Sequence, residues 1–182
     1  MLVSGEYGER CMRENGSNEG KFDWPEGFVP EPVRLDERFS ALDELVSLWE
    51  ASVRSTHVFL TADDIDGLKP VVRMALESIP HLWGMADRSG RWVAFMGVDG
   101  EKLEMLFVHP AFFGLGLGRR LTGMAVRDPG VRFVDVNEQN PKAYGFYRRV
   151  GFSLIGRSEM DGQGNPFPIL HLKWMGGDSF SG

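Results

Sequence analysis

The chain has very little cysteine, since Cys11 is the only one among its 182 residues. A disulfide needs two cysteines and cysteine-based zinc sites use several, so we expect neither a disulfide framework nor a metal site. No apolar run approaches the roughly 20 residues that span a bilayer, and the first residues lack the basic segment and apolar stretch of a secretory signal. The sequence therefore predicts a cytoplasmic protein without a membrane partner.

The chain also lacks an excess of positive charge. Its 20 Lys and Arg residues are outnumbered by 26 Asp and Glu residues, which gives a formal net charge of −6. Nucleic-acid binding needs a concentrated basic face, so we expect no nucleic-acid partner. The net charge leaves small anionic ligands open, because local geometry holds these.

The length and the composition, with 42% hydrophobic and 25% charged residues, fit one globular domain. Residues 1–30 are rich in Gly, Glu, Asn and Ser and show no apolar periodicity, so we expect a disordered or loosely packed extension there. We expect the folded domain over residues 31–175 and a flexible tail over residues 176–182. The sequence does not decide between a monomer and a homodimer.

Apolar periodicity and turn residues predict a mixed fold of the α/β (α+β) class. The expected strands are 33–35, 82–86, 92–98, 102–108, 133–136, 152–158 and 168–174, and the expected helices are 40–55, 61–78, 115–125 and 141–150. Thr61 is expected to cap the second helix, and Asp99-Gly100 to form a type I′ turn. Most neighbouring strands should be antiparallel, but the helix between strands 102–108 and 133–136 predicts a right-handed crossover and a parallel pair.

A glycine-rich loop follows the strand 102–108 and leads into a helix. Gly114, Gly116 and Gly118 allow the backbone to approach a ligand closely, because no Cβ intervenes. Successive amides of such a loop, together with the free N–H groups of the helix start, can hold phosphate oxygens. Glycine spacing alone is equally consistent with a flexible turn.

The helix 141–150 places polar groups on one face. Asn140 is a good N-cap, Pro141 suits the first helical position and Gly151 ends the helix. Asn140, Ala143 and Tyr147 are spaced at i, i+3 and i+7, so they share a face with a small residue between two polar ones. An isolated tyrosine of this kind can also serve only to pack its ring.

These two segments resemble the GNAT superfamily of N-acetyltransferases. Its signature, Gln/Arg-x-x-Gly-x-Gly/Ala after a strand ending in Leu-x-Val-x-Pro, is matched at Leu106, Val108, Pro110, Gly116 and Gly118. Phe113 departs from it, because the family has Gln or Arg there. The second segment matches Asn-x-x-Ala-x-x-Phe-Tyr-x-x-x-Gly-Phe from Asn140 to Phe152. The segments from Thr56 to Leu60 and from Gly156 to Pro166 are most similar to the YjaB-like bacterial branch.

The resemblance implies a coenzyme, a fold and a reaction. The parallel strands should splay apart to admit the arm of acetyl-CoA, and the acetyl group should pass to an amine acceptor. The coenzyme-binding residues implied in this way are Leu106, Phe107, Val108, Phe113, Gly114, Leu115, Gly116, Leu117, Gly118, Arg119, Asn140, Ala143 and Tyr147.

The reaction needs an acid and a base. Tyr147, with an ordinary pKa near 10, can protonate a departing thiolate, so it is the candidate general acid. Glu104 is the candidate general base, because strand alternation places it on the same side as Leu106 and Val108; a solvated strand carboxylate is the alternative. Glu138 is a weaker candidate on the acceptor side. His57 resembles a substrate-side residue, although a lone histidine is more often structural.

Two other functions stay open from the sequence. An acyl-CoA-binding regulatory or sensor domain would keep the loop without turnover. A purely structural module would leave the strand, glycine loop and helix arrangement unexplained.

Overall fold

The computed structural model of the chain describes residues 29–32 and 35–176, with side chains from Arg38 onward. The sequence predictions for residues 1–28, Cys11 among them, and for 177–182 lie outside this range. Seven strands form one sheet in the order β1-β2-β3-β4-β5-β7-β6. Their bounds are β1 Val29–Pro32, β2 His81–Ala86, β3 Trp92–Asp99, β4 Lys102–Val108, β5 Phe133–Asn137, β6 Phe152–Ser158 and β7 Ile169–Trp174.

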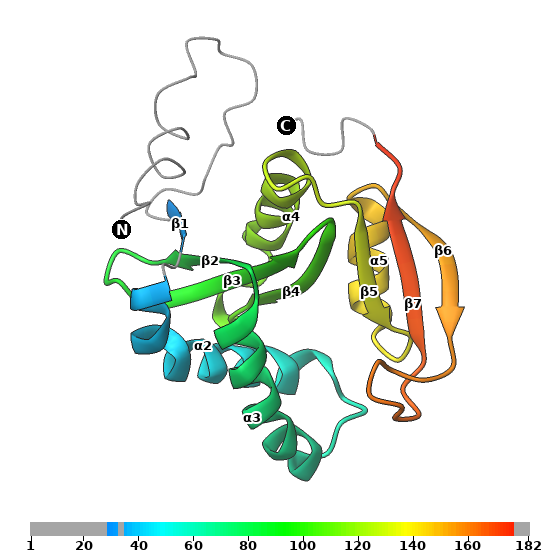
Figure 1. Cartoon of the computed structure of the whole chain (residues 1–182), viewed down its shortest axis with the longest axis horizontal. Helices are drawn as coiled ribbons and strands as arrows, with labels where there is room; N and C mark the ends of the chain where they lie inside the picture. The colour runs from blue at the N-terminus through cyan, green and yellow to red at the C-terminus, as the bar shows by residue number, and fades with distance from the viewer. Residues whose placement is uncertain (1–28, 33–34, 177–182) are drawn as a thin grey trace, which may run out of the picture.

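Helices cover both faces of the sheet (Figure 1). Their bounds are α2 Leu35–Thr56, α3 Ala62–Ser78, α4 Leu117–Arg127 and α5 Pro141–Arg149, with a short 3₁₀ helix at Pro110–Phe112. Buried residues of α2 and α3 pack with Phe95 into one core. Buried residues of α4 pack with β3, β5 and β7 into a second core, to which Tyr147 of α5 also belongs. The element order thus confirms the predicted mixed fold.

The predicted helix caps are present. Thr61 Oγ1 accepts a hydrogen bond from Asp64 N at 3.2 Å, and the Asp64 carboxylate accepts one from Thr61 N at 2.8 Å. This reciprocal box satisfies backbone donors that the first turn of α3 leaves open. Asn140 caps α5, since its Oδ1 accepts from Ala143 N at 3.0 Å. Both caps fix the ends of segments that border the site described below.

The parallel pair splays as expected. β4 and β5 are registered only at Lys102 with Phe133 and at Leu103 with Val134. Beyond these pairs the strands diverge, so that β1–β4 and β5–β7 form two halves of a V (Figure 1). The other neighbouring strands of the sheet are antiparallel.

The first strand is displaced from its predicted position. Leu35 lies in α2, and the strand spans Val29–Pro32, where it pairs with the edge of β2. The segment therefore includes two residues assigned to the extension, and its prolines are compatible with an edge strand. α2 begins five residues earlier than expected. Its first turn is mostly polar, so the apolar periodicity of the sequence does not reveal where the helix starts. Arg38 of that turn is buried and donates to the carbonyls of Glu77 and Ile79 at 3.0 and 2.9 Å.

The turn between β3 and β4 also differs from the prediction. Asp99 pairs with Lys102, so Gly100 and Glu101 are the central residues. Of the two, only Gly100 has a positive φ, at 53°. A type I′ turn needs positive φ at both central residues, whereas type II′ needs it only at the first, so Gly100 identifies the turn as II′-like.

Within residues 29–32 and 35–176, no helix is long and apolar enough to cross a membrane.

Candidate active site

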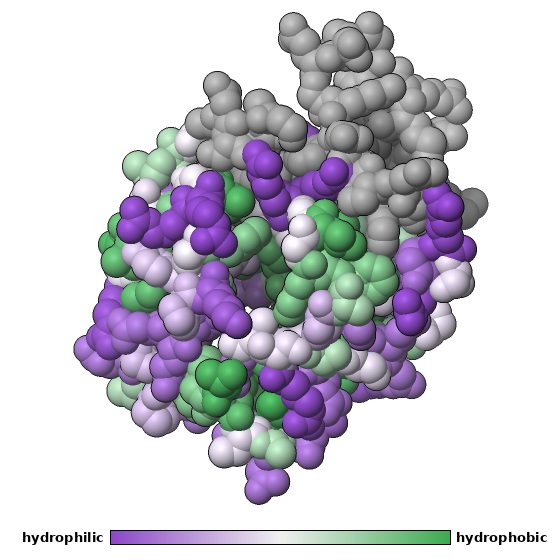
Figure 2. Space-filling model, turned by 180° about the vertical axis from the view of Figure 1, so that it is seen from behind, coloured by the Kyte–Doolittle hydropathy of each residue, from purple (hydrophilic) through white to green (hydrophobic). Residues whose placement is uncertain are grey.

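A cleft of about 740 Å³ opens where β4 and β5 separate. This volume falls in the range of small-molecule sites. The reverse side of the molecule shows a hollow near its centre, bordered by both hydrophobic and hydrophilic residues (Figure 2). The walls come from the end of α2, from β4 and β5, from the loop before α4 and from one face of α5. The cleft therefore joins segments that are far apart in the sequence, from Ser52 to Arg149.

The glycine loop supplies one wall through its backbone. Gly114 and Gly116 have φ angles of 81° and 79°, a left-handed conformation that L side chains rarely adopt. Gly116 caps α4, and Arg120 N donates to its carbonyl at 3.0 Å as the first hydrogen bond of the helix. The N–H groups of the preceding residues, Leu117 and Gly118 among them, therefore have no intrahelical acceptor. This wall offers donors and the positive end of a helix dipole.

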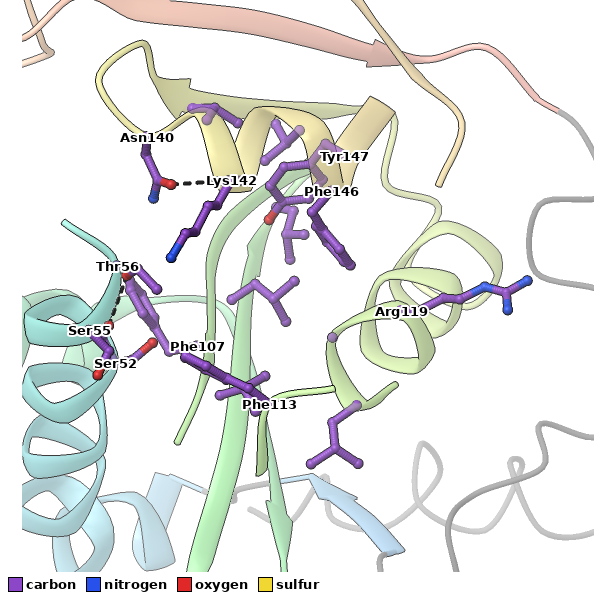
Figure 3. Close-up of a pocket in the computed structure, with 18 of the residues that line it drawn as sticks. Ser52, Ser55, Thr56, Phe107, Phe113, Arg119, Asn140, Lys142, Phe146 and Tyr147 are labelled. Atoms are coloured by element: carbon purple, nitrogen blue, oxygen red, sulfur yellow. Dashed lines mark hydrogen bonds between the residues drawn. The ribbon is translucent and has the colours of Figure 1, made fainter. Parts of the chain in front are cut away.

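Most of the predicted coenzyme-binding residues line the cleft. Leu115 does not, since it is half-exposed on the loop. The Arg119 side chain extends away from the cleft (Figure 3). The predicted residues that line it are Leu106, Phe107, Val108, Phe113, Gly114, Gly116, Leu117, Gly118, Arg119, Asn140, Ala143 and Tyr147.

Tyr147 points from α5 into the cleft (Figure 3). The residue is only 7% exposed, and burial raises its pKa well above the usual value near 10, so the phenol stays protonated. Phe146 and Phe152 hold the ring through edge contacts at centroid distances of 5.0 and 5.6 Å. Tyr147 is therefore a fixed side chain whose hydroxyl is neutral.

The end of α2 forms the facing wall. Ser52, Ser55, Thr56 and His57 line it, and Lys142 of α5 points toward Thr56 across the cleft (Figure 3). His57 Nδ1 lies 2.8 Å from Thr56 Oγ1, and its Nε2 lies 3.4 Å from Asn140 Nδ2. A side-chain contact thus links the two halves of the V near its wide end.

Phe59 and Phe167 make a second contact between the halves. Their ring centroids are 6.1 Å apart. Phe59 lies in the connector between α2 and α3, and Phe167 in the loop before β7. The registered pair Leu103 and Val134 lines the cleft, whereas the two phenylalanines are not among its lining residues.

Glu104 lines the cleft, but its side chain does not follow the regular strand alternation that the sequence predicts. Gly97 is opposite Met105 and Val98 is opposite Leu103, so Glu104 is the extra residue of a β-bulge. The bulge reverses the alternation, because Leu103 and Leu106 both pack in the α4 core although they are three residues apart. Glu104 instead turns toward Lys102, whose Nζ lies 3.1 Å from its Oε1.

Asp135 is a cleft residue that the sequence analysis missed. It lies between Val134 and Val136, which are both in the α4 core, so its side chain faces the other side of the sheet. Lys102 Nζ lies 3.0 Å from Asp135 Oδ2, and His171 Nδ1 lies 2.6 Å from Asp135 Oδ1. Burial opposes the charged form, but these two partners outweigh it and lower the pKa of Asp135.

Ser158 extends this network across β6. Its Oγ lies 2.7 Å from His171 Nε2, so a polar chain runs from β6 through β7 and β5 to Lys102 and Glu104 on β4. The network ties the floor of the cleft to the far edge of the sheet.

Glu138 does not lie at the cleft. Its two carboxylate oxygens each accept from Arg157 at 2.8 Å, and this pairing lowers the pKa of Glu138. Glu138 is thus engaged in an ion pair with Arg157 rather than lining the cleft, and its acceptor-side role stays a prediction.

Several other residues that line the cleft were not predicted from the sequence. Asp135 could have been found from the apolar-polar alternation of β5 beside the predicted parallel strand. In the sequence, polar residues near the end of a predicted helix do not by themselves indicate a site, and this applies to Ser52, Ser55 and Thr56. The other missed residues are Leu103, Pro110, Phe112, Val134, Val136, Asn137, Lys142, Phe146 and Arg149.

Comparisons with known proteins agree with this geometry. The family model described as an acetyltransferase (GNAT) domain matches residues 80–154, from the end of α3 through α5 into β6. The peptidyl-lysine N-acetyltransferase YjaB of Escherichia coli is 40% identical over 134 residues, which is 74% of this chain and 90% of that protein. YjaB of Salmonella typhimurium is 38% identical over 131 residues, or 71% of this chain and 89% of that protein.

Solved structures give the same result. The solution structure of apo-form YjaB from Escherichia coli superposes with a TM-score of 0.72 at 37% identity, covering 82% of this chain and 99% of that one. PaiA N-acetyltransferase from Thermoplasma acidophilum, in complex with coenzyme A, shares the fold with a TM-score of 0.61 at 15% identity, covering 81% and 99%. The splayed strands, the glycine loop before α4 and these relatives lead to one conclusion: the chain belongs to the GNAT family of N-acetyltransferases.

Proposed function

We propose that this protein transfers the acetyl group of acetyl-CoA to the side-chain amine of peptidyl lysine. The observation that carries the proposal is the cleft between β4 and β5, where a backbone phosphate cradle and a buried tyrosine border the same space. The YjaB relatives, named as peptidyl-lysine N-acetyltransferases, support the acceptor class.

The wall that contains the glycine loop is called the donor wall here, because acetyl-CoA, the acetyl donor, would lie against it. Its shape fits a long thioester. The pyrophosphate would lie against the amides from Gly114 to Gly118, at the positive end of α4. Beyond Leu103 and Val134, the facing edges of β4 and β5 have no strand partner within the described residues. Amide groups along the arm of the coenzyme can hydrogen-bond such edges. Gly118 of α4 faces Phe146 of α5, since a Cβ at this position would be in ordinary van der Waals contact with the Phe146 ring at 3.5 Å.

Tyr147 is the proposed general acid. The acetyl group would lie between this residue and the end of α2, and backbone amides of β4 near Met105 and Leu106 would stabilise the developing oxyanion. Protonation of the departing sulfur by Tyr147 completes the exchange. Glu104, the base proposed from the sequence, is bound to Lys102.

Acetyl transfer to a panel of amines tests the proposal. Purified protein is incubated with acetyl-CoA and lysine peptides or small amines, and thiol release and acetylated product are both measured. We expect acetylated lysine peptide in step with thiol release. Coenzyme binding without transfer to any amine would favour a sensor domain instead, and transfer only to small amines would overturn the peptidyl acceptor.

A further inference from the structure

An alkylammonium cannot attack a carbonyl until it has lost a proton, so the cleft must hold a proton acceptor. Among the described residues that line it, three ionisable side chains can serve: Glu104, Asp135 and His57. The two carboxylates share the Lys102 ammonium. Protonation of either would break an ion pair, which makes both poor bases. His57 has no such constraint.

The hydrogen bonds around His57 determine which of its ring nitrogens carries the proton. Asn140 Oδ1 accepts from Ala143 N in the α5 cap, so the Nδ2 donor of Asn140 is the group that faces His57. His57 Nε2 must therefore be the acceptor. Thr56 Oγ1 donates to the Ser52 carbonyl at 2.8 Å, so it accepts from Nδ1–H of the ring. The imidazole is neutral, with its lone pair on Nε2.

Its surroundings keep the ring neutral. Burial lowers the pKa of His57, and a hydrogen bond to the Val53 backbone offsets this only in part. A proton on Nε2 would also face the Asn140 donor, which disfavours the cation further. Apart from Glu104 and Asp135, which share Lys102, the charged side chains that line the cleft without pointing away from it are two cations, Lys142 and Arg149.

The spacing of Asn140 and Tyr147 along α5 is compatible with a base and an acid that act on one substrate. Asn140, which contacts His57, precedes Tyr147 by seven residues, about 10 Å along a helix axis. An amine nitrogen and a thioester sulfur bound to the same carbon, each within about 3 Å of its own catalytic group, span a similar length. The Asn140 contact is long at 3.4 Å, so an incoming amine can replace it at Nε2.

Resting on the acetyl transfer proposed above, we propose that His57 is the general base, whose Nε2 takes a proton from the acceptor ammonium. The freed amine attacks the acetyl carbon, the carbon–sulfur bond breaks, and Tyr147 gives its proton to the sulfur. The nitrogen then loses its second proton, which through solvent replaces the one that Tyr147 gave. The products are the amide, the free thiol and one proton.

The first test is the pH dependence of single-turnover transfer at saturating acceptor. The wild-type rate should fall as the pH drops through the lowered pKa of His57, which places the acid limb below pH 6.5. His57→Gln keeps an oxygen that can accept from Asn140, so the contact between the halves survives while the base is lost. We expect a rate loss of about 10²- to 10⁴-fold and no His limb. His81→Gln, on the exposed start of β2, is the matched control.

Chemical rescue separates a base from a structural residue. His57→Ala leaves space at the cleft, so added imidazole should restore part of its rate, whereas it should not restore Tyr147→Phe. A His57→Gln variant with the wild-type rate and limb would overturn the inference while the proposed function stands. The inference would also be overturned if Glu104→Gln lost the acid limb of the pH dependence and His57→Gln kept it. A wild-type protein that binds coenzyme but acetylates nothing would overturn the proposed function itself.

Discussion

The two walls of the cleft are built from different groups of the chain. Backbone forms most of the donor wall, and side chains form the acceptor wall, which is the side that would face the amine. The donor wall is mostly backbone: glycine φ angles, the amides before α4 and the unpaired edges of two strands. The acceptor wall is made of side chains: His57, which contacts Asn140, and the carboxylates of Glu104 and Asp135, which Lys102 holds from behind the lining. A backbone wall tolerates side-chain changes but not changes of conformation. The acceptor wall should respond to single-atom changes, and the predictions below test this contrast.

The largest expected effect belongs to the residue between the walls. Tyr147→Phe keeps the ring among Phe146 and Phe152 but removes the proton donor. Single-turnover transfer should fall about 10²- to 10⁴-fold, with coenzyme affinity and stability nearly unchanged. Tyr144→Phe on the same helix, which lies outside the cleft lining, is the control. A wild-type rate in Tyr147→Phe would reduce Tyr147 to a packing residue.

The donor wall should fail when its conformation and charge are both altered. Gly116→Glu places a side chain at a φ of 79° and a negative charge beside the phosphates. We expect coenzyme affinity to fall at least about 10-fold by titration calorimetry, since strain of about 1–2 kcal/mol alone is of that order. Gly116→Gln carries the same strain without the charge, and Gly67→Glu tests the charge on the exposed face of α3. Unchanged affinity in Gly116→Glu would mean that the phosphates bind elsewhere.

The acceptor wall should respond to the loss of one charge. Asp135→Asn removes a partner of Lys102 and His171, so the KM for the acceptor should change by about twofold to fivefold while coenzyme affinity does not. The variant should also be slightly less stable at neutral pH. Because the folded pKa of Asp135 is lowered, this stabilisation is present above its unfolded value near 3.8 and is lost as the pH falls through the folded value. Urea unfolding at pH 7 and pH 3 measures it; an equal difference at both pH values would contradict the ion-pair account.

The smallest effect concerns the connector that carries His57. Thr61→Ala removes one half of the capping box of α3 and should cost about 1 kcal/mol in the free energy of unfolding. Thr61→Ser keeps the hydroxyl and should be close to wild type in urea unfolding. Since Thr61 ends the connector on the acceptor side, any change in kinetics should appear in the KM for the acceptor. A change in coenzyme affinity would show that the two walls are coupled.

The same contrast explains how much the sequence could predict. The donor wall carries a local signal in its glycine spacing, and the capped α5 with Asn140 and Tyr147 carries another; these residues line the cleft. The acceptor wall depends on contacts between distant segments. His57 and Asn140 are 83 residues apart, and Ser158, His171 and Asp135 meet only through strand pairing. The bulge at Glu104 could not be seen either, because Lys102 to Met105 alternate as in a regular strand and the apolar run from Met105 to Val108 does not show which residues face which side.

Asn140 has one oxygen and one nitrogen on its side chain, and the two have separate tasks. The oxygen caps α5, and the nitrogen faces the lone pair of His57. Aspartate would cap the helix equally well, yet it would place a carboxylate against the imidazole and favour its protonated form. Replacing the NH₂ group of Asn140 by the oxygen atom of Asp would thus leave the fold intact and favour the protonated, cationic form of His57. At position 140, Asn and Asp would differ little in their effect on helix stability. They would differ in the charge state of His57, which lies 83 positions earlier in the chain.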